Sequence, residues 1–112
     1  MAEMTAEDNK LLTLARGAAS RIGAAEGAAV RDEMGRSYAS AAVTLGSRNF
    51  SALELAVAQA AASGARGLEA AVVVSADDSS DLDVGVVADL GGNGVPMWLC
   101  TLSGDVRAEL MS

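Results

Sequence analysis

Few side chains in this sequence could do chemistry. The chain has no histidine and a single cysteine, Cys100, which excludes imidazole catalysis, histidine metal ligands, an internal disulfide and a cysteine zinc cluster. Residues 91–94, Gly-Gly-Asn-Gly, lack the Lys-Ser/Thr of a phosphate-binding loop. Four aspartates gather in one short segment, without the spacing or the terminal glutamate of an EF-hand loop: Asp77, Asp78, Asp81 and Asp83.

Two serine–acid pairs remain, Ser51 with Glu54 and Ser80 with Asp83. The spacing of three residues is that of a helix capping box, in which the serine oxygen and the acid each accept a backbone N–H. We therefore expect both pairs to begin helices.

The first of these helices, residues 51–64, is the apolar centre of the sequence. Only Glu54 and Gln59 interrupt the apolar residues between Ser51 and Ser63, and Gly64 supplies a left-handed stop. Because a helix that is apolar nearly all round is usually buried, we expect it at the centre of the domain.

The remaining elements are predicted from periodicity and turn signals, and they form one domain over residues 1–112. A helix runs from Thr5 to Gly23, and a further helix follows Asp81 and ends after Leu90. The predicted order is α-β-β-α-β-α-β-β, with three parallel strands and a final antiparallel one. The strands are expected at 28–31, 36–45, 68–74, 95–102 and 106–111, with a turn at 32–35 and a loop at 46–50.

Composition limits the environment and the partners. The chain has 15 acidic and 8 basic residues, a net charge of −7, and the basic residues are dispersed, which disfavours nucleic acid. The N-terminus lacks a basic region followed by an apolar one, and no apolar run is long enough to cross a membrane, so a cytoplasmic protein is expected. Small side chains make a thin core, which favours a homo-oligomer, a dimer or a tetramer.

Several segments resemble cytidine deaminases of the small nucleoside-acting class. Residues 27–38 resemble the first hairpin of that family, and residues 51–56, Ser-Ala-Leu-Glu-Leu-Ala, fall where it has a Cys-Ala-Glu helix start. Residues 68–74 match the following strand, and residues 87–90 resemble the end of the helix that opens with Pro-Cys-x-x-Cys. The resemblance implies a three-layer α/β/α fold around a mixed five-stranded sheet.

The resemblance also implies a zinc site whose residues this chain replaces. Ser51 stands at the first zinc ligand, and Leu53 stands at the glutamate that carries protons while zinc-bound water attacks the pyrimidine. The two cysteine ligands fall near Ser80 and Asp83, and the ribose-binding Asn and Glu fall near Ala42 and Thr44. Since serine and aspartate are poor substitutes for thiolates, we expect no zinc, no cofactor and no catalysis.

These replacements lead to three functional hypotheses. The leading one is a non-catalytic scaffold that binds itself and a protein partner. A small-molecule binder that keeps the pocket for a nucleoside or another metabolite is the alternative, and an unconventional deaminase is the third.

Overall fold

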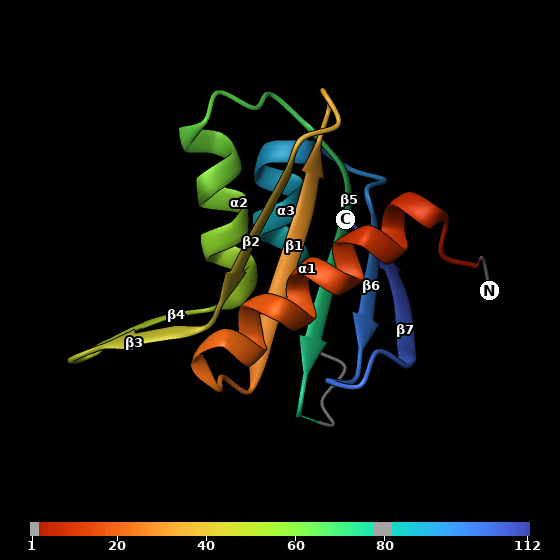
Figure 1. Cartoon of the computed structure of the whole chain (residues 1–112). Helices are drawn as coiled ribbons and strands as arrows, with labels where there is room; N and C mark the ends of the chain where they lie inside the picture. The colour runs from red at the N-terminus through yellow and green to blue at the C-terminus, as the bar shows by residue number, and fades with distance from the viewer. Residues whose placement is uncertain (1–2, 78–81) are drawn as a thin grey trace.

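A mixed five-stranded sheet with helices on both faces forms the body of the protein (Figure 1). The structure is a computed structural model that describes residues 3–77 and 82–112. The strand order is β2-β1-β5-β6-β7, with β1 antiparallel to both β2 and β5, β5 parallel to β6, and β7 antiparallel to β6. Strands β2, β5 and β6 therefore share one direction, which confirms the predicted parallel set and the three-layer α/β/α fold. Their bounds are β1 Glu26–Asp32, β2 Ser37–Ala41, β5 Leu68–Ser75, β6 Pro96–Cys100 and β7 Val106–Met111.

Helix α1 (Ala6–Ile22) covers one face of the sheet. Thr5 and Asp8 form a complete capping box, and Gly23 ends the helix with φ of 63°. Because α1 lies so close to β1, a Cβ on Gly27 would overlap the Ala15 carbonyl group and lie 3.0 Å from Ala19 Cβ. The cluster beneath α1 is built from small and medium side chains: Leu11, Ala15, Ala19, Ala29, Ala70, Val72, Val74, Trp98 and Cys100.

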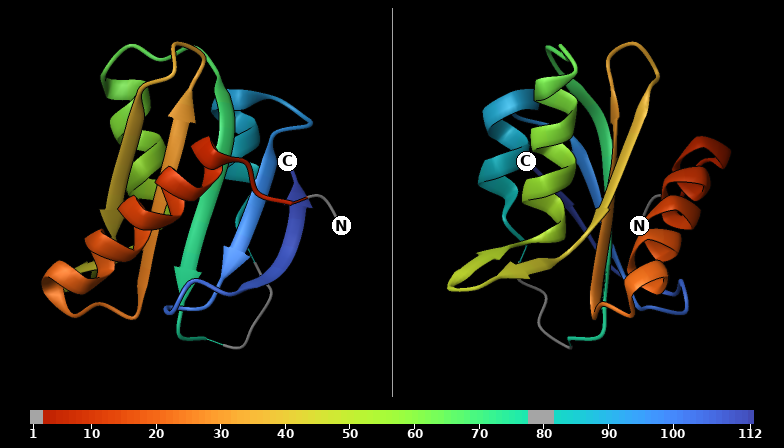
Figure 2. Two further views of the ribbon diagram at one scale, coloured as in Figure 1. Left: turned by 45° about the vertical axis from the view of Figure 1, so that its right-hand side comes forward. Right: turned by 60° about the vertical axis from the view of Figure 1, so that its left-hand side comes forward.

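Helices α2 (Ala52–Ala62) and α3 (Val84–Gly91) cover the opposite face (Figure 2). The prediction that α2 lies at the centre of the domain is wrong, because only one side of it is buried. Its outer side exposes Ala58, Ala61 and Ala62 to solvent. Alanine stabilises a helix without requiring burial, so an alanine-rich outer face has the sequence pattern of a buried helix.

The predicted strand 36–45 is divided in two. Strand β2 ends at Ala41, where its partner β1 begins, and β3 (Val43–Leu45) leaves the main sheet. The predicted loop 46–50 instead contains β4 (Arg48–Phe50), which pairs with β3 around Gly46 at φ of 58°. This β3–β4 arm projects from the body of the protein and pairs with none of the other described strands (Figures 1 and 2).

Helix α3 begins later than predicted. Asp83 is its N-cap and accepts a hydrogen bond from Val86 N at 3.1 Å, whereas the sequence placed Asp83 inside the first turn. The proposed partner, Ser80, lies outside the described residues. None of the described helices is long and apolar enough to cross a membrane.

A buried carboxylate organises the β1–β2 turn. Asp32 is fully buried, and its Oδ1 accepts hydrogen bonds from the Met34 and Arg36 N–H groups, both at 2.9 Å. Its Oδ2 accepts from Arg36 Nε and from the Tyr38 hydroxyl, also at 2.9 Å each. Burial raises the pKa of Asp32, but these four hydrogen bonds outweigh it, so the pKa lies below the ordinary 3.8.

This depressed pKa predicts an acid-sensitive contribution to stability. The ionised Asp32 stabilises the fold above the ordinary pKa of 3.8, and the contribution is lost as pH falls below it. Asp32→Asn should therefore be clearly less stable than the parent chain near pH 7, with a difference that shrinks at lower pH. Urea unfolding of both proteins between pH 7 and 3 measures it, and a pH-independent difference would contradict the prediction.

Candidate functional site

The start of α2 is held by two local side chains. Ser51 Oγ accepts a hydrogen bond from Glu54 N at 3.0 Å, and Glu54 Oε1 accepts one from Ser51 N at 2.9 Å. This is the capping box predicted from the sequence. Ser51 is half-buried rather than buried, and both bonds lie where solvent reaches them.

A third side chain reaches the same helix start from the sheet. Glu26, the first residue of β1, accepts a hydrogen bond from Ala52 N at 3.0 Å through Oε1. A carboxylate at a helix N-terminus is favoured by the partial positive charge of the exposed N–H groups. No local sequence pattern predicts this contact, because 26 positions separate the two residues.

These groups border a surface hollow of about 510 Å³, which we call the α2 hollow. It lies between the first turn of α2 and the β3–β4 arm. Thr44 Oγ1 donates to Asn49 Oδ1 at 2.8 Å across the arm, and Phe50 is half-buried beside it. The lining includes Glu26, Ala42, Thr44, Asn49, Phe50, Ser51 and Glu54.

The α2 hollow brings together three of the six positions at which the resemblance places site residues, namely Ala42, Thr44 and Ser51. The other positions do not border it. Leu53 is 3% exposed and packs in the core between the sheet and α2, and Asp83 caps α3. Ser80 lies outside the described residues.

Two groups bordering the α2 hollow can hold or release a proton, Glu26 and Glu54. Both carboxylates can also accept N–H or O–H donors from a bound molecule. If a bound molecule exchanged a proton with the protein here, Glu26 or Glu54 would be the partner. Cys100 offers no nucleophile, because burial, and then the charge of Asp105, raise the pKa of its thiol to about 11.

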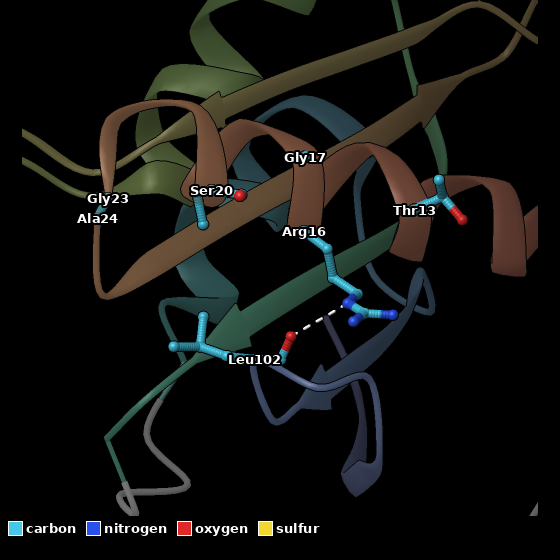
Figure 3. A pocket seen from close by; sticks show the side chains of 8 residues that line it. Thr13, Arg16, Gly17, Ser20, Gly23, Ala24 and Leu102 are labelled. Atoms are coloured by element: carbon cyan, nitrogen blue, oxygen red, sulfur yellow. Dashed lines mark hydrogen bonds between the residues drawn. The ribbon is translucent and has the colours of Figure 1, made fainter.

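Another hollow, of about 570 Å³, lies on the α1 side of the protein, and Figure 3 shows it. Arg16 Nε donates to the Leu102 carbonyl oxygen at 3.1 Å, and Thr13 Oγ1 donates to Asn9 O. Arg16 Nε and the Thr13 hydroxyl thus already bond within the chain, and none of the described positions at which the resemblance places site residues lines this hollow.

Comparisons with known proteins assign the family. The model of the family described as "Cytidine deaminase-like" matches residues 4–104. The chain belongs to the cytidine deaminase-like family. A search of curated protein sequences finds no significant match.

Two solved structures illustrate the likeness in fold. The cytidine deaminase from Burkholderia pseudomallei superposes with a TM-score of 0.79 at 23% identity, over 97% of this chain and 92% of that chain. The cytidine deaminase from Mycobacterium leprae gives a TM-score of 0.63 at 20% identity, over 88% and 90% of the two chains.

The comparisons correct one prediction made from the sequence. Because the expected zinc ligands and the proton-carrying glutamate are replaced, we expected that the chain is not an enzyme. The family whose model matches is described as cytidine deaminase-like, and both similar solved structures are cytidine deaminases. The family therefore indicates an enzyme, and the expectation that it is not one is overturned.

The zinc ion implied by the resemblance does not fit the residues that the structure describes. Ser51 and Asp83 are engaged as helix caps, and Leu53 is an apolar core residue. Within residues 3–77 and 82–112, no three His, Cys, Asp or Glu side chains are grouped so as to hold a metal ion. We therefore derive no step through zinc.

Because Ser51 is half-buried, we expect the loss of its capping bond to cost only a modest part of the free energy of unfolding. Ser51→Ala should destabilise the protein by about 0.5–1 kcal/mol, in the lower part of the range for N-cap serines, because water can replace part of the lost bond. Ser63→Ala, at the other end of α2, is the matched control and should cost less, since Ser63 is exposed and is the C-cap. Equal losses in urea unfolding would refute the capping role.

Proposed function

We propose that the protein binds a nucleoside in the α2 hollow. The observation that carries the proposal is that Ala42, Thr44 and Ser51, at the positions of the family's site residues, border one hollow. Its volume of about 510 Å³ lies within the roughly 300–1,000 Å³ typical of small-molecule sites.

The lining supplies groups for each part of a nucleoside. Phe50 offers an aromatic face on which a base can stack. Thr44 and Asn49 offer a hydroxyl and an amide for sugar hydroxyls, in place of the Asn and Glu that the resemblance leads one to expect near Ala42 and Thr44. Glu26 and Glu54 offer acceptors for N–H or O–H groups.

The test is calorimetric titration with cytidine and uridine, with ammonia release measured on the same samples. Phe50→Ala should weaken binding by about tenfold, from the loss of stacking. Leu45→Ala, which changes an exposed apolar residue on the same arm outside the hollow, should leave binding unchanged. No saturable binding of either nucleoside, or equal effects of the two substitutions, would refute the proposal.

Self-association is a second candidate function, favoured by the β3–β4 arm. Among the helices and strands that the structure describes, the arm has no extensive contact with any other element, and Leu45 near its end is 61% exposed. An isolated two-stranded hairpin is marginally stable, so packing against another copy of the chain would stabilise it. Such an assembly would also enlarge the thin core, as expected from composition.

Light scattering at micromolar concentration tests this second candidate. We expect a dimer or a tetramer for the parent chain and a shift toward monomer for Leu45→Ser. Met34→Ser is the control, because Met34 is also strongly exposed but lies in the β1–β2 turn. A parent chain that is monomeric would remove the candidate.

A further inference from the structure

The turn between α3 and β6 contains an Asn-Gly pair that the function proposed above does not use. Asn93 and Gly94 are both exposed, and Gly94 has φ of 87°. In such a pair the backbone nitrogen of the glycine can attack the amide carbon of the asparagine side chain, because glycine carries no Cβ to obstruct the approach. The attack releases ammonia from the side chain, so this turn is a candidate site of covalent modification.

The other two asparagines of the chain lie in regular structure, and neither is followed by glycine. Asn9 lies in α1, and its Nδ2 donates to Thr5 O at 3.1 Å. Asn49 lies in β4, and its Oδ1 accepts from Thr44 Oγ1 at 2.8 Å. Because both side chains are already bonded and the next residue is bulkier, both asparagines serve as internal references for Asn93.

Ser112 binds the same turn through four hydrogen bonds, which we call the Ser112 clamp. Its backbone oxygen accepts from Gly94 N at 2.9 Å, and its N–H donates to Val95 O at 3.1 Å. Its hydroxyl accepts from Val95 N at 3.0 Å and donates to Gly92 O at 2.6 Å. The left view of Figure 2 shows the end of β7, marked C, beside the loop from α3 to β6. Since Ser112 holds the hydrogen of the attacking nitrogen, the clamp has to open locally before Gly94 N can react.

We propose that Asn93 is a site of spontaneous deamidation whose rate is controlled by the Ser112 clamp. When the clamp opens, Gly94 N forms a bond to Asn93 Cγ, and the bond between Asn93 Cγ and Nδ2 breaks. The proton lost by Gly94 N leaves with Nδ2 as ammonia, and a five-membered succinimide remains. Water then breaks one of the two ring bonds to Gly94 N, which gives aspartate or isoaspartate at position 93.

The isoaspartate product weakens the clamp itself. In isoaspartate the main chain runs through the side chain of residue 93, so the turn is one carbon longer. Gly94 N and Val95 N then no longer match the positions of Ser112 O and Oγ. Deamidation therefore loosens the contact between the end of β7 and the turn. This site is separate from the α2 hollow and does not depend on the function proposed for it.

The test is incubation of the folded protein at mildly alkaline pH, followed by peptide mass spectrometry at all three asparagines. Asn93 should deamidate faster than Asn9 and Asn49. Ser112→Ala removes both hydroxyl bonds of the clamp and should speed deamidation at Asn93 by about three- to tenfold, the effect of losing one neutral hydrogen bond. In urea the clamp is absent, so the parent chain and Ser112→Ala should deamidate at one common rate, above that of the folded parent.

Ser103→Ala is the matched control. The Ser103 hydroxyl also bonds two groups in a turn, Thr101 Oγ1 at 2.9 Å and Asp105 Oδ2 at 3.3 Å, but this turn lies at the other end of β6. The substitution should leave deamidation at Asn93 unchanged. The proposal is overturned if Asn93 reacts no faster than the other asparagines, if folded and urea-unfolded parent chains react equally fast, or if Ser112→Ala has no larger effect than Ser103→Ala.

Discussion

Replacing Gly27 with alanine is expected to destabilise the fold by about 3 kcal/mol, because β1 and α1 have no room for a methyl group between them. The added Cβ would overlap the carbonyl group of Ala15, a backbone group that cannot turn aside, and would lie 3.0 Å from Ala19 Cβ. Relief requires α1 to move away from the sheet, which opens the cluster beneath it. Urea unfolding at neutral pH measures the loss.

Gly17→Ala is the control for this prediction. Gly17 lies within α1, and a Cβ there would meet no atom within 4 Å. Alanine at that position should stabilise the protein by about 0.5–1 kcal/mol, since glycine weakens a helix interior. A similar loss in both variants would contradict the close packing of α1 on Gly27.

Leu53→Glu, which introduces an acid at the position of the family's proton-carrying glutamate, is expected to cost about 3 kcal/mol or more. Leu53 is 3% exposed and packs against the sheet, so the substitution buries a carboxylate among apolar side chains. Burial raises the pKa of the introduced carboxyl, and its protonated form is less costly. The difference from the parent chain in urea unfolding should therefore shrink as pH falls from 7 to 5.

Leu53→Met is the matched control, because it nearly conserves volume and adds no charge. It should cost less than about 1.5 kcal/mol and show no dependence on pH. If Leu53→Glu is as stable as Leu53→Met, then residue 53 faces solvent or a polar pocket, and its placement in the core is wrong.

The buried Leu53 explains why the family's chemistry cannot be transferred to this chain position by position. The family indicates an enzyme, whereas the described residues at the corresponding positions cap helices or pack in the core. The protonatable groups at the start of α2 are instead Glu26 and Glu54, which border the hollow. Functional assays should therefore target these carboxylates and Phe50 rather than restore the family's pattern.

The sequence by itself determined the features that depend on neighbours within a few residues. The capping boxes of Thr5 with Asp8 and of Ser51 with Glu54 each join groups three positions apart, so their pattern is visible in one segment. The glycine stops at Gly23 and Gly64 are local in the same way, since both have positive φ. The order of the sheet elements followed from such signals and from the resemblance.

Tertiary structure alone decided which distant groups meet. Glu26 caps α2 from 26 positions away, Gly27 has to be small because α1 packs on β1, and β3 leaves the sheet because β1 provides no further partner. Trp98 looks like any core tryptophan in the sequence, and only the packing around it shows that its N–H finds no acceptor within residues 3–77 and 82–112. Long-range contacts depend on how whole helices and strands pack, and a local pattern of residue types does not predict that packing.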